Sequence, residues 1–295
     1  MPSALARALR SLDGLSVGDA FGQRFFDSAA VVLRRIGLRE LPPRGWRWTD
    51  DTAMALSIVE TLVAKGRIDQ DTLAAAFARR FRAEPFRGYG GTAKEILRDI
   101  AAGKPWREVS SAVFGGQGSK GNGGAMRAAP IGAYFAGDIP RVIAEARASA
   151  EVTHTNPEGQ AGAIAVAVAA SAAATDGGAR LLYVAAEHCP EGATKSGLLR
   201  AIELPGDTTP ARAAELLGSG GHVISEDTVP FALWCAARHH GNYEDALWAT
   251  VSGLGDADTT CAITGGVVAL SAPELPARFL AAREPLGLDV AVGGA

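Results

Sequence analysis

Apolar residues recur along most of the chain at spacings of three and four residues, which is the period of an amphipathic α-helix. Charged residues lie on the opposite face of each such stretch. The clearest examples are residues 51–66, 71–83, 92–103, 140–151 and 244–253. Several of them begin at Asp or Thr and end near Gly, as helices commonly do. Alternating apolar and polar runs, which are typical of strands, are nearly absent. The pattern predicts an all-α protein, a compact orthogonal bundle of twelve or more short helices.

Three stretches have the weakest helical pattern, and we expect loops there: residues 26–48, 203–210 and 218–224. The longest apolar run, residues 161–174, consists mostly of alanine. It is shorter than the roughly 20 residues that a membrane span requires, so it predicts a buried core helix and no contact with a membrane. No linker and no internal repeat divides the chain. We therefore expect a single domain over residues 1–295.

Composition and charge narrow the classes of function. The chain has 295 residues, 47% of them hydrophobic, and a formal net charge of −3. This balance argues against binding nucleic acid through bulk charge. The three cysteines are far apart and form no Cys-x-x-Cys pair, which makes a disulfide framework and a cysteine zinc site unexpected. The N-terminal apolar stretch is interrupted by Arg7 and Arg10, unlike a signal peptide. We expect a cytoplasmic protein.

Two acidic clusters stand directly before predicted helices. The first is Thr49-Asp50-Asp51-Thr52, and the second is Asp256-Ala257-Asp258-Thr259-Thr260. Each alone is typical of a helix N-cap. Together they offer more carboxylates and hydroxyls than two caps need, and hard divalent cations prefer oxygen ligands. The two clusters therefore predict a site for hard divalent cations such as Mg²⁺, although the residues alone do not distinguish Mg²⁺ from Mn²⁺.

A glycine-rich stretch, residues 115–124, precedes Met126 and Arg127. It lacks the Gly-Lys-Ser/Thr order of a Walker A loop, and its single Gly-x-Gly-x-x-Gly match follows no clear strand. Such a loop exposes many backbone N–H groups and suits a phosphate or pyrophosphate, but it is equally typical of a flexible connector.

A histidine and a short recurrence complete the set of candidates. His154 stands just before the alanine-rich helix, where it could contact a sugar, assist proton transfer or serve only as a structural hydrogen-bonding group. The tripeptide Gly-Asp-Ala occurs at 18–20 and at 255–257, which we treat as coincidence in a chain so rich in Gly and Ala.

Taken together and in order, these motifs resemble the ADP-ribosylglycohydrolases, the group that includes the dinitrogenase reductase-activating glycohydrolases and the ADP-ribosyl-acceptor hydrolases. The resemblance runs from about residue 10 to residue 270. It rests on Gly18–Gly22, Thr49–Thr52, Gly121–Arg127 with Pro130, Thr153-His154, and Gly255–Thr259.

The resemblance implies an all-α bundle with two Mg²⁺ ions. Metal ligands would be Thr49, Asp50 and Asp51 on one side and Asp256, Asp258 and Thr259 on the other. The pyrophosphate and distal ribose would contact Ser119, Gly121, Asn122, Gly123, Gly124 and Met126, with His154 near the ribose. The implied reaction is hydrolysis of the bond at C1″ of an ADP-ribosylated protein or small molecule, an ADP-ribosylated base included, with ADP-ribose as product.

One departure from the family pattern concerns the catalytic carboxylate. Family members commonly carry a glutamate a few residues after the Gly-Asp pair, and by spacing that position is Phe26, with Asp27 next to it. We expect Asp51, Asp256 and Asp258 to take part in catalysis, with Asp27 as a candidate replacement for the glutamate. The alternatives are a relative that binds ADP-ribose with weak or no turnover and a metal-dependent phosphoesterase that acts on a dinucleotide.

Overall fold

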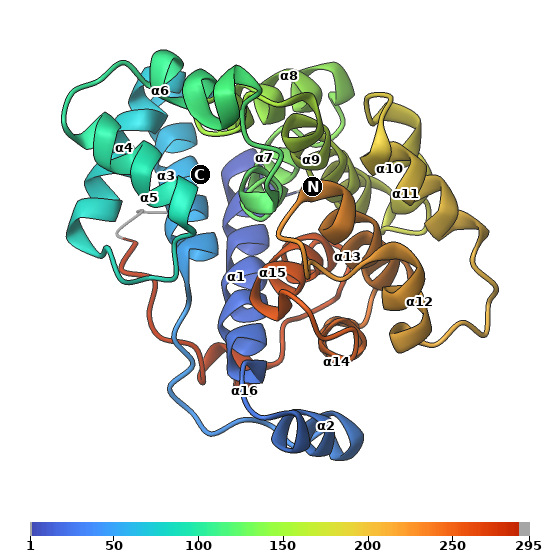
Figure 1. Ribbon diagram of the computed structural model, residues 1–295. Coiled ribbons are helices and arrows are strands. Elements are labelled where there is room, and N and C mark those ends of the chain that lie inside the picture. The colour runs from blue at the N-terminus through green and yellow to red at the C-terminus, as the bar shows by residue number, and fades with distance from the viewer. Residues whose placement is uncertain (1, 289–295) are drawn as a thin grey trace.

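The computed structural model describes residues 2–288, and these residues contain helices and no β-strand (Figure 1). This confirms the all-α prediction. The α-helices are α1 (Ala4–Gly22), α2 (Ala29–Leu38), α3 (Asp50–Lys65), α4 (Gln70–Ala83), α5 (Gly91–Ala101), α6 (Trp106–Ala112), α7 (Ala129–Tyr134), α8 (Ile139–Glu151), α9 (Pro157–Asp176), α10 (Leu181–His188), α11 (Ala193–Glu203), α12 (Pro210–Leu217), α13 (Ser225–Arg238), α14 (Tyr243–Val251), α15 (Ala257–Val268) and α16 (Ala277–Leu280). Short 3₁₀ turns lie at Gln23–Phe25, Val113–Gly116 and Asn122–Gly124.

Several helices begin directly after a residue whose side chain caps them. The side chains of Asp69, Asp138 and Asn242 each accept a hydrogen bond from a backbone N–H in the first turn of the helix that follows. Such caps satisfy amide groups that have no partner within the helix. The alanine-rich run lies within α9, whose residues from Ala161 to Ala173 are all buried. No helix between residues 2 and 288 has the length and apolar character needed to cross a membrane.

Helix α2 corrects the expectation of a loop over residues 26–48. Its sequence places apolar residues on one side, but only Val32 is buried. The helix lies apart from the other helices at the lower end of the view in Figure 1. The expectation of a loop was therefore wrong for the ten residues of α2, while the residues on either side of it, 26–28 and 39–48, contain no α-helix.

Helices α1 and α15 pack at very short range near the centre of the molecule (Figure 1). A Cβ at Gly14, Gly18 or Gly22 would lie within 2.4 Å of a backbone oxygen in α15. Residues four apart lie on one face of a helix, so these three glycines form a smooth stripe that admits the backbone of α15. Because no side chain separates the two helices, polar groups beside the stripe are brought close to the start of α15.

Candidate active site

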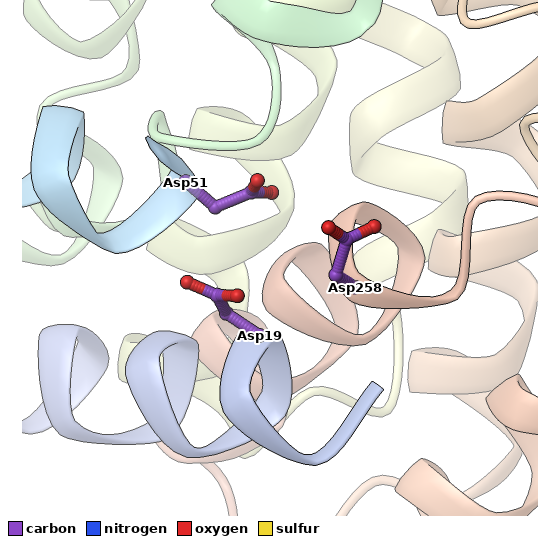
Figure 2. Close-up of side chains that lie close together, drawn as sticks. All are labelled: Asp19, Asp51 and Asp258. Carbon is purple, nitrogen blue, oxygen red and sulfur yellow. The ribbon is translucent and has the colours of Figure 1, made fainter. Parts of the chain in front are cut away.

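Three carboxylates from three helices meet beside this helix pair. They belong to Asp19 in α1, Asp51 in the first turn of α3 and Asp258 in the first turn of α15, and Figure 2 shows them converging. One carboxylate oxygen from each lies within 4.8 Å of the others. We refer to Asp19, Asp51 and Asp258 as the acidic triad. The structure therefore brings together the two acidic clusters that the sequence places far apart.

Asp19 was not among the residues expected at the site. It is fully buried, and its carboxylate accepts hydrogen bonds from the backbone N–H and hydroxyl groups of both Thr49 and Thr52. These bonds cap α3 from a neighbouring helix and fix the position of its first turn. The sequence feature that could have indicated Asp19 is its position between Gly18 and Gly22, two glycines spaced four residues apart.

Asp51 presents an oxygen atom suited to a metal ion. Its Oδ2 accepts a hydrogen bond of 3.0 Å from the Thr49 hydroxyl, whereas its Oδ1 is buried and has no hydrogen-bond partner among the described residues. Leaving a buried carboxylate oxygen without a partner is costly. A divalent cation with a preference for oxygen ligands would supply the missing partner and offset the clustered negative charge, so the residues of the acidic triad fit such an ion.

Burial and mutual repulsion raise the pKa values of these carboxyl groups. Burial raises the pKa of Asp19 to about 6, in spite of its hydrogen bonds from Thr52 and Thr49. Burial, followed by the charge of Asp19, raises the pKa of Asp50 to about 7. The pKa of Asp51 is raised by burial and by Asp19, and that of Asp258 by burial and by Asp256. Compared with an ordinary aspartate, each group is therefore harder to ionise, and a bound cation would oppose this effect.

The other two acidic residues flank the triad. The Asp50 carboxylate lies against the turn at Gly88, where a Cβ would be 3.2 Å from Asp50 Oδ1. Asp256 precedes α15, and its Oδ2 accepts a hydrogen bond of 2.7 Å from Asn122. The backbone N–H of Thr259, a buried residue, donates to Asp258 at 2.9 Å. Asp50 and Asp256 thus border the triad without joining it directly.

The glycine-rich loop is tied to the acidic residues through Asn122. The Asn122 side chain donates to Thr228 as well as to Asp256, and its backbone N–H donates to the carbonyl of Val223. Ser119 accepts a hydrogen bond from the backbone N–H of Gly121. Gly123 and Gly124 form a 3₁₀ turn with Asn122. Hydrogen bonds of Asn122 therefore tie the loop to Asp256 and to Thr228.

His154 lies beneath this turn. A Cβ at Gly121 or at Gly123 would be 3.2 Å from His154 Nε2, so the two glycines make room for the ring. Met126 is buried on the same side, with its Sδ 3.9 Å from a Cβ built at Gly123. Burial, together with the charge of Arg127, lowers the pKa of His154 to about 3.

The structure does not bring Asp27 into the acidic triad. Its Oδ1 accepts a hydrogen bond from the backbone of Ser28, and its Oδ2 lies 3.5 Å from Arg35 in α2. The side chain is 44% exposed, and Phe26 is likewise exposed. Neighbouring partners and solvent satisfy Asp27, so nothing draws its carboxylate toward the buried cluster.

Strained backbone lies in the loops around the site. Phe114, Val223 and Leu254 are exposed and adopt positive φ angles of 53°, 57° and 58°. Phe114 precedes the glycine-rich loop, Val223 bonds to Asn122, and Leu254 precedes Gly255 and Asp256. Such conformations cost on the order of 1–3 kcal/mol each and cluster at functional sites.

The sequence profile of the ADP-ribosylglycohydrolase family matches residues 1–291. The chain belongs to the ADP-ribosylglycohydrolase family. Two relatives share the name ADP-ribosylhydrolase ARH3. The human protein is 28% identical over 309 residues, with 90% of this chain and 85% of that protein covered. The chicken protein is 36% identical over 175 residues, with 54% and 47% covered.

A bacterial relative and a solved structure extend the comparison. The ADP-ribosyl-[dinitrogen reductase] glycohydrolase of Rhodospirillum rubrum is 32% identical over 168 residues, with 53% of this chain and 54% of that protein covered. The matches to the chicken and R. rubrum proteins thus span about half of each relative. A solved "ADP-ribosylglycohydrolase-related protein complex" has a TM-score of 0.68 at 24% identity, with 96% of this chain and 94% of that chain covered. This likeness supports the shared fold.

Proposed function

We propose that this ADP-ribosylglycohydrolase hydrolyses the glycosidic bond at C1″ of an ADP-ribosylated acceptor and releases ADP-ribose. The observation that carries the proposal is the meeting of Asp51 and Asp258 in one acidic triad, with Oδ1 of Asp51 buried and without a hydrogen-bond partner among residues 2–288. A helix cap alone would not need carboxylates from three different helices. The family membership supplies the substrate class.

We further propose a centre of two Mg²⁺ ions, with Mn²⁺ as a possible substitute. The residues that would hold them are Thr49, Asp50, Asp51, Asp256, Asp258 and Thr259. The chemistry that divalent ions supply in such a site is to orient oxygen groups of the substrate and to make a water molecule more acidic. The threonine hydroxyl beside Asp51 and the amide beside Asp256 hold those carboxylates in place.

The chain's own groups would serve the two halves of the substrate. Backbone N–H groups from Ser119 to Gly124 suit the pyrophosphate and distal ribose, with Met126 and His154 beneath the turn. Glycosidic cleavage passes through an oxocarbenium-like state, whose positive charge the carboxylates would stabilise. We propose that one of Asp51, Asp256 and Asp258 accepts a proton from the attacking water.

A second candidate function follows from the position of Phe26. A phenylalanine can neither bind a metal nor move a proton, and Asp27 is held by Ser28 and Arg35. A protein that lacks the expected glutamate could bind ADP-ribose tightly with little turnover. The structure favours the hydrolase because the acidic triad and the loop are both intact.

One incubation separates these functions. The protein is mixed with Mg²⁺ and with ADP-ribosylated arginine peptides, serine peptides and an ADP-ribosylated base, and the products are resolved by chromatography. We expect free ADP-ribose from at least one acceptor. Tight binding of ADP-ribose without any product would support the binding protein. Release of AMP, with ribose phosphate left attached to the acceptor, would instead indicate a phosphoesterase, and either result would overturn the proposal.

A further inference from the structure

A buried arginine lies behind the candidate ribose-binding histidine. Arg127 is fully buried, and its guanidinium contacts no carboxylate closely enough to form an ion pair among the described residues. Its Nη2 instead donates to the carbonyl of Ser149 at 2.9 Å and to the hydroxyl of Thr153 at 2.8 Å. The ring of Phe77 lies 4.6 Å from the guanidinium carbon. Burying a cation without an ion pair is unfavourable, so we infer that Arg127 has a role beyond packing.

Thr153 connects this arginine to the histidine. Its Oγ1 lies 2.7 Å from His154 Nδ1, and Thr153 is 1% exposed. An arginine can only donate hydrogen bonds, so Thr153 Oγ1 must accept from Arg127. The hydroxyl proton of Thr153 is then free to point at His154 Nδ1. In that arrangement Nδ1 accepts, and the ring proton must reside on Nε2.

The opposite tautomer fits the surroundings less well. If Nδ1 carried the proton, Thr153 Oγ1 would accept from both His154 and Arg127. Its own buried hydroxyl proton would then lack an acceptor among the described residues, which is unfavourable. A doubly protonated ring would add a second positive charge beside the guanidinium. Burial and that guanidinium hold the pKa of His154 near 3, in agreement with a neutral ring.

The Nε2 side of the ring faces the glycine-rich loop. His154 is 7% exposed, and its Nε2 makes no hydrogen bond with the described residues. Gly121 and Gly123 lie directly over this atom, because a Cβ added at either glycine would be 3.2 Å from Nε2. The ring therefore presents an unused donor at the place where the loop would receive a ligand.

We propose that Arg127 and Thr153 are positioning residues that lock His154 in the neutral Nε2–H tautomer, as a fixed donor to an oxygen atom of the bound ligand. His154 then acts as a hydrogen-bond donor and not as a proton shuttle. The identity of the ligand, ADP-ribose, rests on the proposed function. The assignment of the tautomer rests only on the contacts of Arg127, Thr153 and His154. Either the ligand or the tautomer can therefore be refuted without the other.

The tautomer can be read directly from the free protein. Long-range ¹H–¹⁵N correlation spectra of the full chain labelled with ¹⁵N-histidine distinguish a protonated ring nitrogen from an unprotonated one. His154→Gln identifies the signals of His154 among the five histidines. We expect a neutral ring with the proton on Nε2 in the wild type and in Thr153→Ser. A wild-type ring with the proton on Nδ1 would overturn the proposal.

A matched pair of variants tests what the lock does for binding. Thr153→Asp provides only acceptors, so it should move the ring proton to Nδ1, whereas Thr153→Ser keeps the hydroxyl. We expect the affinity for ADP-ribose, measured by calorimetry, to fall about tenfold in the Asp variant and to stay within about twofold in the Ser variant. If the Asp variant does not fold, Thr153→Val replaces it, with an expected loss of about fivefold.

Two ligands locate the oxygen that His154 contacts. A loss of affinity for both ADP and ADP-ribose would indicate a phosphate oxygen, and a loss for ADP-ribose alone would indicate the distal ribose. Equal affinity of the Asp or Val variant and the wild type for both ligands would overturn the positioning role. A wild type that carries the Nε2 proton but binds no ADP-ribose would refute the proposed ligand and leave the tautomer lock standing.

Discussion

The carboxylate of Asp19 in α1 accepts hydrogen bonds from both the backbone N–H and the hydroxyl of Thr52 in α3. The same carboxylate also accepts from both groups of Thr49. A residue in the last turn of one helix thereby caps the beginning of another. This capping sets the position of Asp51, whose Oδ1 has no hydrogen-bond partner within the described part of the chain.

Replacing Asp19 with Asn tests this capping role. An amide offers one acceptor oxygen where the carboxylate offers two, so several donors at the start of α3 lose their partner. We expect the free energy of unfolding with saturating Mg²⁺ to fall by about 1–3 kcal/mol. Without metal the loss should be smaller, because the variant also removes one charge from the acidic triad. Denaturant unfolding with Mg²⁺ and with EDTA measures both values.

A matched control for this experiment is Asp99→Asn. Asp99 is an exposed aspartate paired with Lys104, and we expect a change within about 0.5 kcal/mol in either buffer. If Asp19→Asn behaves like this control in Mg²⁺, Asp19 does not organise the first turn of α3.

The stability of the metal-free protein should depend on pH through the acidic residues. The pKa of Asp19 is raised to about 6 and that of Asp50 to about 7, from an ordinary value of 3.8. A group whose pKa is raised by folding contributes stability below its unfolded pKa and loses that contribution as the pH rises through the folded pKa. In EDTA, the free energy of unfolding should therefore fall as the pH rises from about 4 to about 7.

Two comparisons isolate this effect from other titrating groups. Asp50→Asn removes one of the responsible carboxyls and should flatten the fall in EDTA. Saturating Mg²⁺ should also reduce it, because the ion stabilises the deprotonated groups. A wild type and an Asp50→Asn variant with the same pH profile in EDTA would contradict the account.

The contact between α1 and α15 predicts a strong effect of a single methyl group. A Cβ at Gly18 would lie 2.0 Å from the carbonyl oxygen of Cys261, so Gly18→Ala must push the two helices apart. We expect a loss of about 3 kcal/mol or more in the free energy of unfolding, together with weaker metal binding. Thermal unfolding and a Mg²⁺ titration measure the two effects.

Gly37→Ala is the control for Gly18→Ala. Gly37 lies in α2 with open space around its Cα, and alanine favours the helix by up to about 1 kcal/mol. The control should be neutral or slightly more stable. Equal effects at the two positions would mean that the close packing of α1 on α15 is not required.

Asp27 should prove dispensable for catalysis. The structure pairs it with Arg35 on the isolated helix α2 and leaves it partly exposed. We expect Asp27→Asn to retain the rate of ADP-ribose release within about twofold, since no transition-state contact is removed. A loss of 100-fold or more would show that α2 moves Asp27 to the substrate, and the assignment of catalytic carboxylates would then change.

The all-helical class of the fold could be predicted because amphipathic periodicity and capping residues are features of the local sequence. The starts of α4 at Gln70 and α8 at Ile139 follow from the capping aspartates before them. Helix α2 escaped prediction because it buries little more than Val32. Its stability depends on its place in the fold, which local sequence does not encode.

The candidate site was predictable in part. Asp51 and Asp258 stand out in the sequence because each begins a helix beside other acidic residues. Asp19 does not stand out, since it lies within α1. Its role depends on the close approach of α15 at Gly18 and Gly22 and on the hydrogen bond from Thr52. The two Gly-Asp-Ala segments, treated as coincidence, both lie at the acidic triad: the first contains Asp19, and the second directly precedes Asp258. Such meetings depend on long-range packing, which periodicity does not reveal.

The central claim is that Asp51 and Asp258 meet to hold divalent ions, and calorimetric titration with Mg²⁺ tests it most directly. We expect the wild type and the Asp99→Asn control to bind the ion equally. Asp51→Asn and Asp258→Asn should each weaken binding by more than about tenfold. Equal Mg²⁺ affinity in all four proteins, or no binding by the wild type, would contradict the account.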